Sequence, residues 1–481
     1  MRLFPYSNNG LLQTLFIIMV AFALLGPTFG ISLTPNFKLT LFRVTFFALL
    51  ALLVRQWVHR HRLEVAHMHR IRYYLGFFGF WLVYSALSLA WAADSGLGIR
   101  YTVFLFMMTT LCLAFPFFIR SEESLWRISR AVFWTFFIIV AYGVFESVSH
   151  IHLPSSRYWE QESAAVTSFF NNQNDLATAI TLLFPFLALA LYMVRGGLRQ
   201  KGLIYVAIVF ALYCLLVTGS RGNTFFALPL MVIAWLATLP FTVPREKLLN
   251  WRNWLKGAGV LISIALIVGF MYMFLYDGAT RGKLATAFGI FLDIQGTTWD
   301  VDEWSGELEA GAGTRGMSIV TRWYLLMYGL RFLKESHFMG VGAGNVEAHM
   351  EAYRGLLDNK LNIHNWWAEV LVNYGVIVFA LYVMLYAVLL WRLWKLARLK
   401  TSPRISPLVR WGAYSSMLAL IGYLFGGMVP STAIHFTPMW IVHGIALAVV
   451  VVGEIQKERR KNADGDPLDV HVFEEGALKG E

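Results

Sequence analysis

The sequence predicts an all-α polytopic membrane protein with about twelve transmembrane helices and a large extracytoplasmic loop between spans nine and ten. Of its 481 residues, 57% are hydrophobic and only 14% are charged, whereas about a quarter of a soluble globular chain is charged. Apolar stretches of about 20 residues, long enough to cross a hydrocarbon core of roughly 30 Å, recur along nearly the whole chain. Basic residues gather in alternate connections between these stretches.

The spans are expected from apolar length alone. The first stretch, LLQTLFIIMVAFALLGPTFG, could be taken for a secretory signal, but a second run (FRVTFFALLALLV) follows almost at once, so an uncleaved span is expected. Spans are predicted to begin near residues 11, 37, 73, 101, 131, 174, 203, 223, 258, 368, 412 and 437. The two cysteines, Cys112 and Cys214, fall inside these spans and are expected to be buried apolar side chains.

The orientation follows from the charges of the connections. One alternate set is rich in arginine and lysine, as in HRHRLEVAHMHR, RLWKLARLKTSPR and the final KERRK. The other set is nearly bare of charge, as in ADSGLG, TGSRGN and STAIHFTP. The positive-inside rule therefore places both termini in the cytoplasm. The net charge of +11 indicates contact with anionic lipid headgroups and not with nucleic acid.

A single transmembrane domain is expected over residues 1–454, followed by a flexible cytoplasmic tail over 455–481. The domain includes a large outer loop over 277–367 with amphipathic helices. A loop of this length is usually functional or disordered, and its aromatic content argues against disorder. The outer-face histidines His150, His152 and His435 have no visible partners in the sequence.

Arg221 is the first candidate site residue. It lies in LLVTGSRGNTFFALP, a connection of only a few residues between two spans. Gly219, Ser220 and Gly222 around it would let a ligand approach the backbone closely. The alternative is an arginine whose side chain extends to lipid headgroups, as is common at helix ends.

Arg315 and Arg322 form the second candidate group, in GAGTRGMSIVTRWYLLMYGLRF. A spacing of seven places both guanidinium groups on one face of a helix. A planar guanidinium binds phosphate through two parallel hydrogen bonds. Together with Arg221, these residues could bind a pyrophosphate without a metal; a solvated cationic face is the alternative.

His364 is the third candidate, in NKLNIHNWWAEVLVNYG. An unperturbed imidazole has a pKa of about 6.5 and suits a general base near neutral pH. A histidine at the mouth of a span is more often a hydrogen-bonding partner at the interface. The following Trp366–Trp367 pair is expected to anchor the segment at headgroup depth.

The remaining signals are weaker. Asp300 and Asp302 (TTWDVDEW) resemble the acidic pair with which some glycosyltransferases hold a divalent metal, although a solvated acidic turn is the better explanation. His349 and Glu347 lack the histidine pair of a helical zinc site. The sequence has neither a P-loop nor a GxSxG motif, so it gives no support to ATP hydrolysis or serine-hydrolase chemistry.

Four segments resemble the O-antigen ligase and polymerase family, in the family's order. They are FFNNQNDLATAITLLFPFLAL, TGSRGNTFFAL, TRWYLLMYGLRFLKESHFMGVGAGN and HNWWAEVLVNYGVIVFALYV. The resemblance covers roughly residues 130 to 390. It departs from the commonest pattern at Ser336–His337–Phe338, where a proline often follows the histidine. The teichuronic-acid or exopolysaccharide branch is the closest match in length and basic character.

The resemblance implies an outer-leaflet enzyme that transfers a glycan from undecaprenyl pyrophosphate to an acceptor hydroxyl, with inversion and without a metal or other cofactor. Arg221 and Arg322 match the family's phosphate-binding arginines, and His364 matches its loop histidine, the base for the attacking hydroxyl. Arg315 has no firm counterpart and is a second-tier candidate. Expected partners are the lipid-linked glycan, an acceptor glycan or lipid-linked sugar, membrane lipid and a polysaccharide assembly complex.

Two other readings remain open. Twelve spans with both termini inside also suit a secondary transporter or flippase for a polysaccharide precursor, but such proteins place ionisable residues within their spans. A non-catalytic scaffold explains the topology but not the arginines and histidine. Ligase and polymerase activities are not separated by the sequence.

Overall fold

The computed structural model describes residues 6–34, 37–60, 65–161, 166–275, 317–353, 361–430 and 434–465. The long helices are α1 (Tyr6–Leu24), α2 (Leu41–Arg60), α3 (Arg72–Leu87), α4 (Ser95–Phe118), α5 (Glu122–Ser149), α7 (Gln173–Met193), α8 (Leu198–Val217), α9 (Leu228–Thr242), α11 (Trp251–Leu275), α14 (Met317–Glu335), α16 (Trp366–Ala397), α17 (Pro407–Gly426) and α18 (Thr437–Gly465). Short elements lie between them: η1 (Gly26–Thr28), β1 (Gly30–Thr34), β2 (Phe37–Thr40), η2 (Ala66–Ile71), η3 (Ser88–Ala90), α6 (Tyr158–Gln161), η4 (Asn223–Ala227), α10 (Arg245–Leu249) and α15 (Asn345–Glu351).

The predicted fold class is confirmed. Within the described residues, eleven helices are long and apolar enough to cross a membrane, and a shorter apolar helix, Gly10–Leu24, stands where the first of the twelve predicted spans was expected. The one described sheet is the antiparallel pair of β1 and β2. Helix α18 continues to Gly465, past the predicted domain end at residue 454. Cys112 and Cys214 are buried and free.

Helices α17 and α18 form the centre of the bundle. Helix α17 packs against α7, α16 and α18, and α18 packs against α4. Glycines allow these helices to pack closely. A Cβ on Gly412 would lie 2.9 Å from a methyl of Val449. A Cβ on Gly444 would lie 2.5 Å from the ring of Phe115. Close approach at small residues is how helices associate in a solvent as apolar as their side chains.

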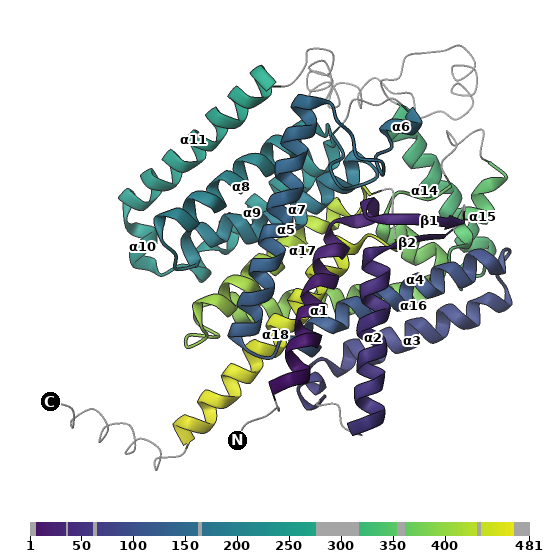
Figure 1. The fold of residues 1–481 in the computed structure, drawn as a ribbon, viewed down its shortest axis with the longest axis horizontal. Coiled ribbons are helices and arrows are strands. Elements are labelled where there is room, and N and C mark those ends of the chain that lie inside the picture. Colours follow the sequence, from purple (N-terminus) through teal and green to yellow (C-terminus); the bar gives the residue numbers. More distant parts are fainter. Residues whose placement is uncertain are drawn as a thin grey trace.

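One end of the bundle carries most of the irregular structure, and we call it the loop face. It comprises the described connections over residues 25–34, 37–40, 88–94, 150–161, 166–172, 218–222, 427–430 and 434–436, together with α14, α15 and the start of α16. Hydrogen bonds join these pieces across long sequence distances: Thr28 donates to the carbonyl of Phe169 (2.8 Å) and the Asp94 N–H donates to Asn345 (2.6 Å). In the view of Figure 1, α6, α14 and α15 lie on the right-hand side.

The opposite end, the basic face, holds the connections over residues 65–71, 119–121, 194–197, 243–250 and 398–406 and the end of α18. Arg392 joins two of these pieces by donating to the Arg70 carbonyl (2.8 Å) and to Glu454 (2.7 Å). Gln456 donates to Glu122 (2.5 Å). The described chain therefore crosses alternately between the two faces, with the end of α18 at the basic face (Figure 1).

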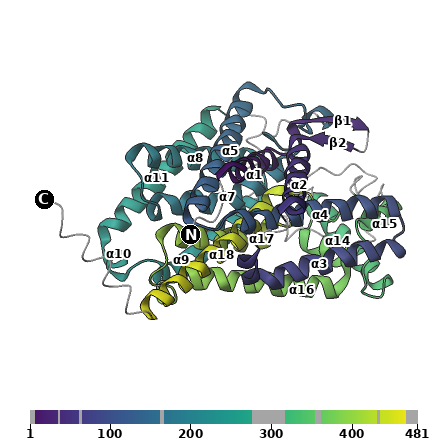
Figure 2. The same ribbon diagram turned by 60° about the horizontal axis from the view of Figure 1, so that its bottom comes forward.

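A kink in α16 shapes the loop face. Gly375 interrupts the helix with a φ of 79°, and Gly340, at a φ of 88°, lies against it so closely that a Cβ on Gly340 would meet the Gly375 nitrogen at 2.5 Å. Backbone hydrogen bonds from Val341 to Val372 (2.9 Å) and from Gly342 to Asn373 (3.0 Å) fasten the α14–α15 connection to the first part of α16. Figure 2 shows α14 and α15 near the α16 end of the bundle.

Candidate functional site

His364 stands in a left-handed backbone conformation, with a φ of 53°. Side-chain-bearing residues seldom adopt this conformation, and such strain concentrates at functional sites. The imidazole is half-buried. The segment around His364 must therefore be held by its neighbours.

The residues on both sides of His364 are fixed by hydrogen bonds. The Ile363 N–H donates to Glu369 Oε1 at 2.6 Å. The Asn365 side chain caps α16 by accepting from the N–H groups of Trp367 (3.1 Å) and Ala368 (3.4 Å). The Trp366 N–H donates to the carbonyl of Gly427 at 2.8 Å. The N-cap residue Asn365 has an extended backbone, so His364 stands just before the first turn of α16.

Glu369 is a buried carboxylate that the sequence did not single out as a site residue. Its side chain is 3% exposed, and its second oxygen accepts from Asn373 Nδ2 at 3.0 Å. Asn373 Oδ1 in turn accepts from the N–H of Val346 at 3.3 Å. The Glu369–Asn373 pair therefore ties the His364 segment to the start of α15.

Arg221 lies in the tight connection between α8 and η4. Gly219, with a φ of 63°, makes the turn. Next to it, the buried Asn223 donates to the hydroxyls of Thr178 (3.0 Å) and Ser220 (3.1 Å) and accepts from Thr181 (3.0 Å). The chain then continues as the π-helical turn η4, a feature frequent at functional sites. The loop that carries Arg221 is thereby fixed to α7.

The Arg221 loop and the His364 segment meet the same stretch of chain. A Cβ on Gly222 would lie 2.5 Å from Val429, and one on Gly426 would lie 3.4 Å from Asn223 Oδ1. Gly427, between them, accepts the hydrogen bond from Trp366. Residues 426–429 therefore join two candidate segments that are far apart in the sequence.

Arg322 approaches the same region from α14. Leu325, three residues further on, is fully buried in a cluster with Ile363 and Val372, and a Cβ on Gly329 would lie 2.7 Å from Ile363 Cδ1. Positions three and seven residues after Arg322 share its helix face, so this face of α14 packs on the residue next to His364. Burial lowers the pKa of the Arg322 guanidinium, because a charged group loses its hydration there.

The structure thus brings together Arg221, Arg322 and His364 in one region of the loop face. Arg315, Asp300 and Asp302 lie outside the described residues. Over the part of the chain that the structure describes, no group of three or more His, Cys, Asp or Glu side chains is arranged to hold a metal. Glu347 accepts from the Tyr101 hydroxyl (2.8 Å), and His349 contacts the Asn345 carbonyl (2.9 Å).

Two expectations from the sequence were wrong. Trp366 is 3% exposed and bonds the Tyr382 hydroxyl at 3.0 Å, so it packs inside the bundle and is no headgroup anchor. His152 does have a partner: its Nδ1 lies 2.7 Å from the buried Glu146. Glu146 also accepts from the N–H groups of Thr167 (3.0 Å) and Ser168 (2.6 Å). The loop between α5 and α7 folds back on α5, which the sequence does not reveal.

Two further arginines lie elsewhere on the loop face, beside the ring of His435. The guanidinium carbons of Arg43 and Arg100 lie 5.3 and 5.9 Å from the ring centre of Phe104, and the His435 ring lies 5.3 Å from the same centre. His435 follows the stretch that contacts Gly222 by only a few residues. A face with several cations attracts anionic substrates.

Two comparisons with known proteins cover the segments that carry these residues. A family model described as O-antigen ligase matches residues 206–383, a stretch that contains Arg221, Arg322 and His364. The chain is also 27% identical over 462 residues to the teichuronic acid biosynthesis protein TuaE of Bacillus subtilis (strain 168), covering 94% of this chain and 87% of that relative. Both findings support an enzyme that is a cell-surface polysaccharide ligase or polymerase. The resemblance to the O-antigen ligase and polymerase family is confirmed, and the chain is a multi-pass helical membrane protein whose residues 206–383 match the O-antigen ligase model.

Proposed function

We propose that this protein transfers or polymerises a glycan from undecaprenyl pyrophosphate onto an acceptor sugar hydroxyl at the outer leaflet of a bacterial plasma membrane. The convergence of Arg221, Arg322 and His364 on one region of the loop face carries the proposal. The similarity to TuaE supports a teichuronic acid or a related exopolysaccharide as the polymer.

In this reaction the bond between the anomeric carbon and the pyrophosphate oxygen breaks, and the leaving oxygen keeps the electron pair. The acceptor hydroxyl oxygen attacks the opposite side of the anomeric carbon, so the configuration inverts. His364 takes the hydroxyl proton as a general base. The strained backbone at His364, fixed by Glu369 and Asn365, would keep the imidazole in position as the proton moves.

Arg221 and Arg322 would bind the pyrophosphate and stabilise the charge that develops as it leaves. Fixed cations aimed at developing charge are usually the largest contribution to catalysis. The partial burial of Arg322 strengthens its interaction with phosphate, because the effective dielectric constant is lower away from water. These two arginines could supply charge that other transferases obtain from a divalent metal, and Arg315 is proposed to add to them.

The orientation follows from the same charges. We infer that the basic face, with its arginines and lysines, faces the cytoplasm together with both termini, and that the loop face is external. A lipid-linked glycan that has already reached the outer leaflet would then meet the arginines directly.

Transfer by purified protein in proteoliposomes tests the proposal. His364→Ala and Arg322→Ala should each abolish transfer from a fluorescent undecaprenyl-pyrophosphate-linked glycan while leaving expression intact. Arg331→Ala is the matched control, because Arg331 lies nine residues further along α14, on the opposite helix face, where it pairs with Glu335 (2.8 Å). Full activity of the His364 or Arg322 variant would refute the assigned roles.

Two further outcomes decide between the alternatives. Activity that requires Mg²⁺ or Mn²⁺ and is lost in Asp300→Ala would favour the metal-dependent transferase. Movement of the glycan across the bilayer without a new covalent linkage would favour the flippase. In cells, deletion of the gene should cause lipid-linked single repeats to accumulate if the enzyme is a polymerase, and full-length chains if it is a ligase.

A further inference from the structure

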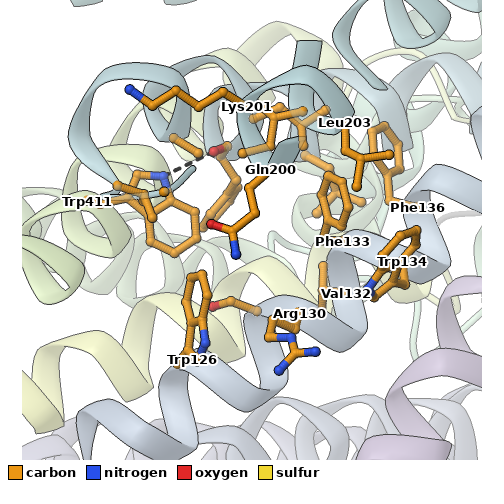
Figure 3. Close-up of a pocket in the computed structure, with 18 of the residues that line it drawn as sticks. Trp126, Arg130, Val132, Phe133, Trp134, Phe136, Gln200, Lys201, Leu203 and Trp411 are labelled. Atoms are coloured by element: carbon orange, nitrogen blue, oxygen red, sulfur yellow. Dashed lines mark hydrogen bonds between the residues drawn. The ribbon is translucent and has the colours of Figure 1, made fainter. Parts of the chain in front are cut away.

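A cavity lies between α5, α7 and α8, away from the candidate transfer site. Its volume is about 340 Å³, within the range of roughly 300–1,000 Å³ typical of small-molecule sites. The walls are almost entirely apolar and include Phe133, Phe136, Leu187 and Ile204. Trp411 presents only its ring, because its indole N–H donates to the Phe186 carbonyl at 3.0 Å (Figure 3).

The cavity extends from the basic face to the middle of the bundle. It follows α7 from Leu183 to the end of that helix at Met193 and continues to the α7–α8 connection. At a rise of about 1.5 Å per residue, the part of α7 from Leu183 to Met193 is roughly 15 Å long. That length is half of a hydrocarbon core of roughly 30 Å. The cavity therefore has the depth of one leaflet.

Three cations border the cavity at the basic face. Arg130, Arg195 and Lys201 contribute to its lining, and all three are exposed. Among the described residues none of them forms an ion pair, whereas Arg127, one turn before Arg130, pairs with Glu123. Figure 3 shows the polar ends of Arg130 and Lys201 at the margin of the cavity, with Gln200 between them.

An exposed tryptophan marks the depth of this margin. Trp126, in the first turns of α5, lines the cavity and is 37% exposed. Tryptophan prefers the level of the headgroups, where an apolar ring and a polar N–H are both accommodated. The cations beside Trp126 thus lie where lipid phosphates lie.

We propose that this cavity binds one anionic phospholipid of the leaflet at the basic face. One acyl chain fills the apolar cavity to the midplane, and the phosphate is bound by Arg130, Arg195 and Lys201. An uncharged or zwitterionic lipid would fill the same volume but would gain less from the three cations, since its headgroup carries no net negative charge.

The polyprenyl substrate is a poorer occupant. Its pyrophosphate would be bound by arginines on the loop face, and the three cations of this cavity are on the opposite face. The site is therefore separate from the proposed transfer reaction, and its test does not depend on enzyme activity.

The test uses the full-length protein in phosphatidylcholine vesicles that contain a small fraction of spin-labelled phosphatidylglycerol or, in parallel, spin-labelled phosphatidylcholine. The measured quantity is the ratio of the motionally restricted fractions of the two labelled lipids. We expect the triple variant Arg130→Gln, Arg195→Gln, Lys201→Gln to lower the preference for phosphatidylglycerol at least threefold. The matched control removes the same charge from another part of the basic face, with Arg245→Gln, Lys247→Gln and Arg252→Gln, and should leave the preference nearly unchanged.

A second pair of variants tests the acyl chain. Ala190 lines the cavity, so Ala190→Leu should fill part of it and lower the restricted fraction. Ala188→Leu, on the same helix but outside the cavity, should not. An equal loss of preference in both triple variants would overturn the proposal, because it would indicate general surface charge. No loss in the cavity variants, or displacement of the labelled lipid by undecaprenyl phosphate, would overturn it as well.

Discussion

Glu369 Oε1 accepts a 2.6 Å hydrogen bond from the backbone N–H of Ile363, the residue immediately before His364. A buried carboxylate thus holds the segment that carries the proposed base, although it is six positions further along the chain. Its other oxygen is occupied by Asn373. The position of His364 is therefore set from within α16.

Glu369→Gln should leave the fold intact and lower the transfer rate about tenfold, which corresponds to about 1.4 kcal/mol. A neutral amide oxygen accepts the Ile363 N–H more weakly than a carboxylate does. Glu369→Ala leaves that buried N–H unsatisfied and should cost about 1–3 kcal/mol in stability as well. The measurements are the transfer rate in proteoliposomes and the thermal unfolding midpoint.

The control for Glu369 is Glu335→Gln, which changes an exposed carboxylate on α14 that pairs only with Arg331 among the described side chains. It should alter neither quantity. Equal effects of the two substitutions would show that Glu369 does not position His364.

Asn223→Ala should lower kcat/KM for the lipid-linked donor about tenfold, mainly through KM. The substitution removes three buried hydrogen bonds, to Thr178, Thr181 and Ser220, and so loosens the loop that carries Arg221. Asn253→Ala serves as control, because the Asn253 side chain donates to the Lys247 carbonyl on the basic face (2.9 Å). An unchanged KM in the Asn223 variant would contradict the proposed link between loop order and donor binding.

Gly375→Ala should destabilise the protein by about 2 kcal/mol or more. An added Cβ would lie 2.4 Å from the Met339 carbonyl oxygen, and the φ of +79° is unfavourable for alanine. Gly79→Ala is the control, since apart from its own stretch of helix nothing lies within 4 Å of its Cβ position and alanine is the better helix former. A midpoint of thermal unfolding that falls equally in both variants would refute the assignment of the kink to this close contact.

His152→Phe should lower the free energy of unfolding by about 1–3 kcal/mol, because the buried Glu146 loses one of its hydrogen-bond partners. A phenyl ring would still stack on Tyr158, whose ring centre lies 3.9 Å from that of His152. The effect therefore reports the hydrogen bond and not the ring contact. His150→Asn, at an exposed position with a φ of 56° that asparagine tolerates, should change the midpoint little; a matching loss there would argue against the Glu146–His152 pair.

The sequence predicted the membrane spans well because one physical quantity, apolar length, decides them. Arg221, Arg322 and His364 were selected from short motifs, and their roles stay predictions. What brings them together could not be predicted: the contact between Gly222 and Val429 and the bond between Trp366 and Gly427 depend on how α16 and α17 pack. The Glu146–His152 pair was missed for a related reason. Hydrophobic periodicity predicts helices, but it does not predict the path of a loop that folds back on its helix.

The kink at Gly375 has a consequence for the bilayer. Helix α16 has 32 residues, and at about 1.5 Å per residue it would be about 48 Å long, far more than a hydrocarbon core of roughly 30 Å. The part after the kink, from Val376 to Ala397, covers roughly 33 Å and is sufficient to cross by itself. The part before the kink, with Glu369 and Asn373, would then stand above the lipid as a platform. Burying a carboxylate and an amide there avoids the free-energy cost of placing polar groups in the hydrocarbon core. The histidine proposed as the catalytic base would then be held by protein contacts above the membrane surface.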